Sequence, residues 1–77
     1  MNIENVQKRF KIMLNNLGMT QKELSNATGI RESDVSYYCN GLRCPSALAL
    51  IKIAAATSVS PSWILGFGTD EEMEEIK

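Results

Sequence analysis

The positions of helix-starting and helix-ending residues constrain this chain most, because they divide it into short segments. Gly18 ends the first segment, and Thr20 with Glu23 forms the sequence of a capping box that starts the next one. The first segment, residues 2–17, carries apolar side chains at helical spacing: Ile3, Val6, Phe10, Met13, Leu14 and Leu17. The pattern predicts an amphipathic helix there, followed by a second helix over residues 21–28.

The same punctuation continues to the end of the chain. Gly29 permits a sharp turn after the second helix, and Pro45 and Pro61 each stand at the start of another helical segment. No segment has the alternation expected of a strand. We therefore expect an all-α domain in residues 1–68 and an acidic tail in residues 69–77. Its remaining helices are predicted over residues 32–40, 46–58 and 62–65.

The fourth predicted helix is unusually rich in alanine and leucine. Such a composition is typical of a helix that is buried on most sides. We expect it to be the central helix, with an inner stripe of Ala47, Leu50, Ile51, Ala54 and Thr57, and with Ile53 nearby.

The composition argues against several classes of function. The 77 residues contain no histidine, and the two cysteines, Cys39 and Cys44, cannot make a metal site alone. We expect reduced, partly buried thiols, no cofactor and no enzymatic activity, since no thiol stands beside a base and no glycine loop cradles a phosphate. The chain begins without an apolar leader, and its richest apolar stretch is too short to cross a bilayer, so we expect a cytoplasmic protein.

The net charge of −1 is unevenly distributed. Residues 69–77 hold five acidic residues and one lysine, which leaves seven basic and four acidic residues, a net charge of +3, in residues 1–68. A mildly basic body is compatible with nucleic acid but does not by itself predict it. For the tail we expect a solvated end, with a frayed helix or an acidic mimic of DNA as alternatives.

The order of these motifs resembles the phage lambda-repressor and Cro-like helix-turn-helix family, the xenobiotic response element family of transcriptional regulators. The similarity covers roughly residues 6–66 and includes the stretches Met19-Thr20-Gln21-Lys22-Glu23-Leu24, Gly29-Ile30, Val35-Ser36, Asn40-Gly41 with Pro45, and Val59-Ser60-Pro61-Ser62-Trp63-Ile64-Leu65-Gly66. It implies a sequence-specific DNA-binding transcriptional regulator, a repressor, that works as a homodimer on double-stranded DNA. It also implies a five-helix fold with the helix-turn-helix at the second and third helices.

The resemblance also implies roles for individual residues. The third helix would lie in the major groove, and the positions that reach base edges match Arg31, Glu32, Ser33, Ser36 and Tyr37. Contacts to phosphates are implied for Gln21, Asn40 and Arg43, and we expect Lys22 to contact a phosphate as one of the few basic residues nearby. A helical projection centred on Val35 independently places Ser33, Ser36 and Tyr37 outward. Two-fold contacts are implied near the fifth helix, at Trp63 and Phe67, although core packing is the other interpretation of Trp63.

Two acidic residues, Glu32 and Asp34, stand where a DNA-reading helix begins. They can complement the positive end of the helix, with Asp34 also reaching back to free backbone amides, since Arg31 supplies no side-chain cap. Alternatively, Glu32 accepts a hydrogen bond from a cytosine amino group and repels phosphates elsewhere. Ser25 and Thr28 also depart from the family pattern, and we expect both departures, like Arg31, to weaken the fold slightly.

These acids and the low net charge keep a rival hypothesis open. The same fold can be a protein-interaction module that presents Tyr37, Tyr38 and the acidic tail to a protein partner such as a toxin or an anti-repressor. An antitoxin would combine both activities.

Overall fold

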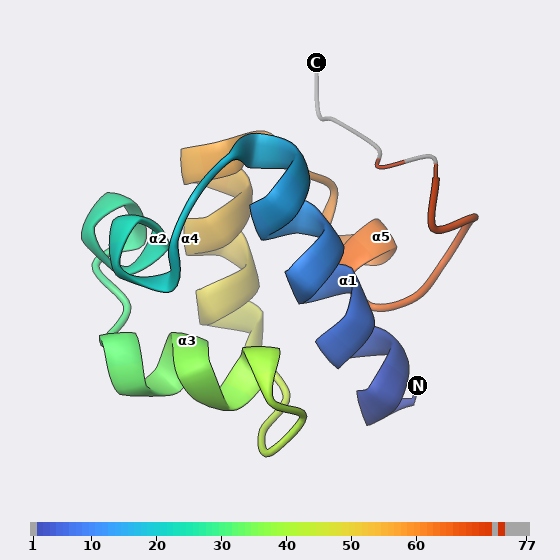
Figure 1. Ribbon diagram of the computed structural model, residues 1–77, viewed down its shortest axis with the longest axis horizontal. Coiled ribbons are helices and arrows are strands. Elements are labelled where there is room, and N and C mark those ends of the chain that lie inside the picture. The colour runs from blue at the N-terminus through green and yellow to red at the C-terminus, as the bar shows by residue number, and fades with distance from the viewer. Residues whose placement is uncertain (1, 72, 74–77) are drawn as a thin grey trace.

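The computed structural model describes residues 2–71 and 73, and these form five helices and no strand. Each predicted helix is confirmed, with ends that differ from the predicted ones by one residue at most. Figure 1 shows how they are arranged. The helices are α1 (Ile3–Leu17), α2 (Gln21–Thr28), α3 (Glu32–Cys39), α4 (Ala47–Thr57) and α5 (Pro61–Ile64).

Local side-chain chemistry explains where the helices begin and end. The capping box of α2 is present: the Glu23 amide donates to Thr20 Oγ1 at 3.1 Å, and the Thr20 amide donates to a Glu23 carboxylate oxygen at 3.0 Å. Gly18 closes α1 in the left-handed conformation, with φ of 63°. Neither device needs a distant partner, so both could be predicted from the sequence.

The helices enclose a single apolar core. α1 packs against α3 and α5, and α2 packs against α3 and α4. The rings of Phe10 and Tyr38 meet with centroids 5.4 Å apart, which joins α1 to α3. The largest side chains that are fully buried in this core are Trp63, Phe10, Met13, Leu24, Ile53, Ile64, Val6, Val35 and Val59.

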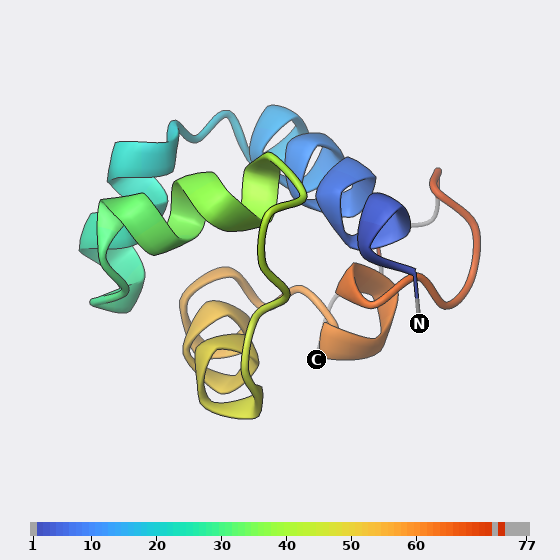
Figure 2. The ribbon, with the colours of Figure 1, turned by 90° about the horizontal axis from the view of Figure 1, so that it is seen from below.

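The prediction that α4 is central and mostly buried is wrong. Only Ala49 and Ile53 of this helix are buried, while Leu48 and Ile51 are 60% and 63% exposed. The expected stripe fails at Ala47 and Ile51, which are exposed, while Leu50, Ala54 and Thr57 are only half-buried, because the inward face is turned toward Ala49 and Ile53. α4 therefore forms one side of the molecule, which lies along the lower edge of Figure 2. Its exposed Leu48 and Ile51 make that side partly apolar.

Arg9 of α1 is buried, although the periodicity of the sequence placed it outside the apolar face. Its guanidinium donates to the carbonyl oxygens of Trp63, Phe67 and Gly68 at 2.7, 3.0 and 2.8 Å. It also lies 4.7 Å from the centroid of the Trp63 ring and forms an ion pair with Asp70 at 2.7 Å. Arg9 thereby fixes the segment that follows α5 against α1.

Asp70 is also ion-paired with Lys8. The hydrogen bonds from Lys8 and then from Arg9 hold the pKa of the Asp70 carboxyl below its ordinary value. The start of the acidic tail is thus docked on α1, which differs from the expected solvated end. Residues 72 and 74–77 lie outside the described residues, and the expectations for the rest of the tail stay untested.

Candidate nucleic-acid interface

The turn between α2 and α3 gives the two helices their relative position. Gly29 adopts φ of 76°, and Ile30 after it is buried. Thr28 Oγ1 donates to the Leu24 carbonyl at 2.7 Å and accepts from the Ile30 amide at 3.2 Å, while Ser25 Oγ donates to the Ile30 carbonyl. These hydroxyls give the turn polar partners that apolar residues lack, so the expectation that Ser25 and Thr28 only weaken the fold overlooked their hydrogen bonds.

α3 presents a polar surface to solvent. Arg31, just before the helix, and Glu32 and Ser33 in its first turn are exposed, and one turn later Ser36 is half-buried and Tyr37 is 38% exposed. Val35, Tyr38 and Cys39 on the opposite face are buried in the core. The predicted outward direction of Ser33, Ser36 and Tyr37 therefore agrees with the structure, and their contact with bases stays a prediction. Figure 2 looks onto the side of the molecule that carries α3.

Asp34 does not cap α3 with its side chain. Arg31 occupies the N-cap position, and its side chain makes no capping hydrogen bond to the backbone. Its carboxylate instead accepts from Arg31 Nε at 3.2 Å and from Arg43 Nη1 at 3.5 Å. The Arg43 guanidinium also lies 5.0 Å from the centroid of the Tyr37 ring. Four residues of the candidate interface are thus linked in one cluster.

The residues expected at phosphates lie at the edges of this surface. Gln21 begins α2 and is half-buried, and Lys22 beside it is exposed. Asn40 follows α3, and its amide nitrogen donates to the Ser36 carbonyl at 2.9 Å and to Ser36 Oγ at 3.2 Å. Arg43 is exposed in the loop before α4. Contact of these four side chains with phosphates stays a prediction.

Gly41 brings the loop after α3 close to α1. It adopts φ of 70°, and a Cβ atom at this position would lie 2.7 Å from Gln7 Oε1. The Asn40-Gly41 pair predicted the end of α3, but the close approach of Gln7 could not be predicted, because it joins segments far apart in the chain. The loop that carries Arg43 is therefore held beside α1.

The cysteines are placed as expected for packing residues. Both thiols are free, with Cys39 buried and Cys44 half-buried. Burial raises the pKa of the Cys39 thiol, so the reactive thiolate is disfavoured at neutral pH. Burial and then the nearby Asp34 carboxylate raise the pKa of the Tyr38 hydroxyl. Within the described part of the chain, no group of three or more His, Cys, Asp or Glu side chains is placed to hold a metal ion.

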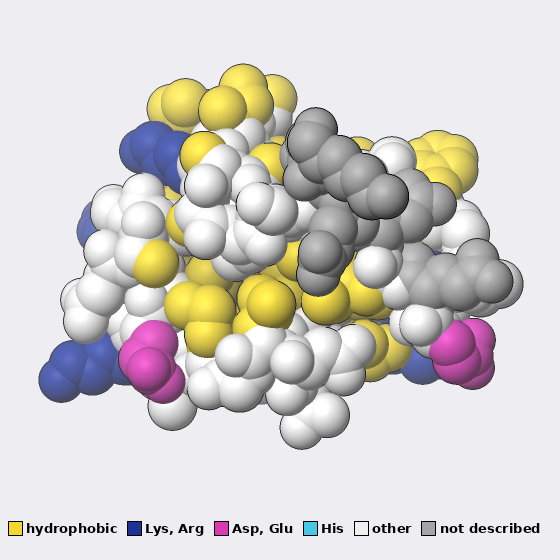
Figure 3. Space-filling model, turned by 90° about the horizontal axis from the view of Figure 1, so that it is seen from above, with side chains coloured by type: hydrophobic (Ala, Val, Ile, Leu, Met, Phe, Trp, Pro, Cys, Tyr) yellow, Lys and Arg dark blue, Asp and Glu magenta, His cyan; other side chains and the backbone are white. Residues whose placement is uncertain are grey.

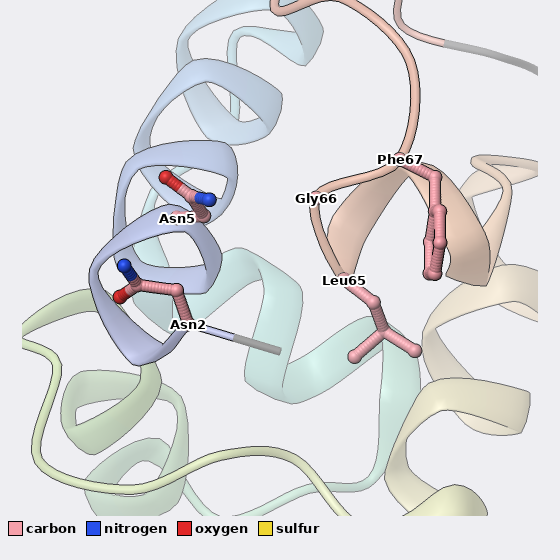
Figure 4. Close-up of a pocket in the computed structure, with 5 residues that line it drawn as sticks. All are labelled: Asn2, Asn5, Leu65, Gly66 and Phe67. Atoms are coloured by element: carbon pink, nitrogen blue, oxygen red, sulfur yellow. The ribbon is translucent and has the colours of Figure 1, made fainter.

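The two residues expected at a dimer contact differ in exposure. Trp63 is 0% exposed, and its indole nitrogen donates to the Thr69 carbonyl at 3.0 Å. This burial corrects the expectation that Trp63 touches a partner and supports the core-packing interpretation. Phe67 is 68% exposed and borders an open hollow of about 460 Å³, drawn in Figure 4. The other residues around this hollow are Asn2, Asn5, Leu65 and Gly66.

The fold and the polar surface of α3 define the class of DNA-binding helix-turn-helix regulators. The helix-turn-helix family model matches residues 10–64, which is most of the chain. The chain belongs to this family, whose members are the lambda repressor and Cro-like regulators. No curated protein and no solved structure matches the chain. None of the helices in the described residues has the length and apolar character needed to cross a membrane.

Proposed function

We propose that this protein is a sequence-specific transcriptional repressor that inserts α3 into the major groove. The observation that carries the proposal is the exposed polar surface of α3, with Arg31 before the helix and Arg43 after it both extending their guanidinium groups to the Asp34 carboxylate. A helix of this kind fits the width of the major groove, where each base pair presents a distinct pattern of donors and acceptors. Repression would follow from occupying the site.

Two sets of residues would divide the work. Those on the outer face of α3 would read base edges: Arg31, Glu32, Ser33, Ser36 and Tyr37. Those at the edges of the surface would bind phosphates, which fixes the position of the helix but does not distinguish sequences: Gln21, Lys22, Asn40 and Arg43.

Selection from a pool of random DNA duplexes at low salt is the direct test. We expect enrichment of a two-fold symmetric site whose half-sites lie about one helical turn apart. With two to three ionic contacts per protomer, the logarithm of the affinity of the dimer should fall with the logarithm of the salt concentration with a slope of roughly −4 to −5. A folded protein that enriches no sequence, or a slope near zero, would contradict the proposal.

The symmetric site requires a homodimer, and we propose that α4 and the residues after α5 supply its surface. Leu48 and Ile51 of α4 and Phe67 after α5 are exposed apolar residues, and Lys52 is the only charged residue of α4, so two copies can approach with little repulsion. Apolar side chains protrude along the same edge at the top of Figure 3. If the two-fold axis passes through the edge formed by α4, parallel to the viewing direction of Figure 2, the two copies of α3 lie on the same face of the dimer.

Replacing Ile51 by glutamate should raise the dissociation constant of the dimer at least tenfold, because a carboxylate would be buried in an apolar contact. Sedimentation equilibrium over a range of concentrations measures this constant. Asn16→Glu is the matched control, because it adds the same charge to an exposed position of α1. Equal dissociation constants for the two variants would show that the dimer contact lies elsewhere on the surface. A wild-type protein that is monomeric at all concentrations would show that the homodimer does not form.

A second candidate function is binding to a protein partner, as in an antitoxin. The pairing of Asp34 with two arginines favours it, because the pairing reduces the positive charge offered to phosphates. The duplex selection separates the two functions, since a protein-binding module enriches no site.

A further inference from the structure

Asp34 occupies a central place in the candidate interface. Its side chain is 17% exposed, whereas those of its partners Arg31 and Arg43 are 79% and 58% exposed. The carboxylate is therefore held by its surroundings, while the arginines extend over it toward solvent. One negative charge is shared by two positive groups that the proposed function assigns to DNA.

The bond to Arg31 uses a particular atom of the guanidinium. Nε donates to Asp34 Oδ2 at 3.2 Å, and the terminal nitrogens Nη1 and Nη2 are not part of this bond. A guanidinium carries five N–H donors in a rigid plane, so fixing Nε still leaves terminal donors for a second partner. Guanine offers O6 and N7 in the major groove, which accept two such donors. The pairing with Asp34 thus orients Arg31 toward guanine and leaves its terminal N–H donors available.

Arg43 is held by two groups. Its Nη1 atom lies 3.5 Å from Asp34 Oδ1, and its guanidinium faces the Tyr37 ring at 5.0 Å. A phosphate that binds Arg43 must therefore compete with a carboxylate and an aromatic ring. Phosphate contacts form on DNA of any sequence, so this competition weakens binding to unrelated DNA.

From these contacts we infer that Asp34 is a specificity-determining residue, which positions Arg31 to read guanine and restrains Arg43 from binding phosphates on unrelated DNA. The inference rests on the proposed DNA-binding function. Specificity is a difference between two affinities, and Asp34 acts on both: it supports the correct complex and disfavours the incorrect ones. Asp34 is a positioning residue in this account, because it touches DNA through the arginines only.

The test compares Asp34→Asn with wild type on the selected site and on a random duplex of equal length. We expect the affinity of the dimer for random DNA to rise about fivefold and its salt slope to steepen by about 2, because Arg43 of each protomer becomes available to a phosphate. We expect the affinity for the selected site to fall, so that the ratio of the two affinities drops about tenfold or more. Repeated selection with the variant should show a weaker preference for guanine at one position.

Glu4→Gln is the matched control. It removes one negative charge from the first turn of another helix, α1, and Glu4 is exposed and forms no ion pair with any residue that the structure describes. Equal effects of the two variants on random DNA would show general charge repulsion and overturn the inference. Parallel losses on both duplexes, together with a lower melting temperature, would show a structural role and overturn it as well.

Double-mutant and single-residue variants keep the inference testable if Asp34→Asn folds poorly. Adding Arg43→Gln to Asp34→Asn should remove most of the increase in affinity for random DNA that Asp34→Asn produces alone, since the effects of coupled residues are not additive. Arg31→Lys alters a 79%-exposed side chain, so the fold is not at risk, and lysine cannot present a planar pair of donors. Selection with Arg31→Lys should lose the guanine preference, and an unchanged preference would overturn the inference. If the wild-type protein enriches no site in the duplex selection, the proposed DNA-binding function itself is wrong.

Discussion

Replacing Arg9 by alanine should lower the free energy of unfolding by about 3 kcal/mol, because it leaves buried acceptors without a donor. The arginine is 4% exposed and serves three backbone carbonyls, in addition to the Asp70 carboxylate and the face of Trp63. For a domain of this size, such a loss corresponds to a decrease of roughly 10 to 20 °C in the melting temperature. Thermal unfolding followed by circular dichroism measures it.

Lys8→Ala is the matched control for this experiment. Lys8 contacts the same Asp70 carboxylate, but its side chain is 61% exposed, and exposed ion pairs contribute little. The comparison belongs at neutral pH, because the lowered pKa of Asp70 keeps its contribution complete above the ordinary pKa and loses it only in acid. Arg9→Lys should also destabilise the protein, since an ammonium cannot reach all four oxygens. If Arg9→Ala melts like Lys8→Ala, Arg9 does not anchor the segment after α5.

The contrast between Thr20 and Arg9 explains which parts of the fold could be predicted. Thr20 bonds to Glu23 three residues away, so its role is contained in a short stretch of sequence. Arg9 bonds to residues that follow it by 54 to 61 positions, and an arginine on the solvent side of a periodic pattern is ordinarily exposed. Only the packing of α5 against α1 turns that side of the helix into an interior.

The prediction of which face of α4 is buried failed for a related reason. Nearly every face of this helix is apolar, so periodicity cannot distinguish the inward side, and burial of Ile53 was decided by α2 and α5. In the sequence, the exposed residues Leu48 and Ile51 look the same as residues of the buried core. An apolar surface of this kind can be distinguished from core only by its position in the folded chain.

The candidate interface was partly predictable. The outward direction of Ser33, Ser36 and Tyr37 follows from helical spacing around Val35. The pairing of Asp34 with Arg31 is also local, at three positions, but its pairing with Arg43 spans nine positions and the end of α3. That second contact depends on the turn at Gly41, where α1 approaches closely. The sequence therefore predicted which residues face outward, but it did not predict that two of the arginines share one carboxylate.

Replacing Ser33 by aspartate should weaken binding to the selected DNA site at least about 100-fold. Ser33 is exposed between Glu32 and Asp34, and a third adjacent carboxylate would face the phosphates in both protomers. The protein itself should remain folded and equally stable, because an acidic residue in the first turn of a helix complements its positive end. A large loss of binding without a loss of stability is the result that the proposed groove-reading role of α3 requires.

Ser62→Asp makes this prediction discriminating. It introduces the same residue in the first turn of another helix, at an exposed position of α5, and should leave DNA affinity within about twofold once salt is fixed. Fluorescence anisotropy with a labelled duplex gives both affinities, and thermal unfolding confirms that both variants fold. Should Ser33→Asp bind the site as well as Ser62→Asp does, α3 does not lie in the groove. The exposed surface of α3 would then have to serve a protein partner, where an added carboxylate need not oppose binding.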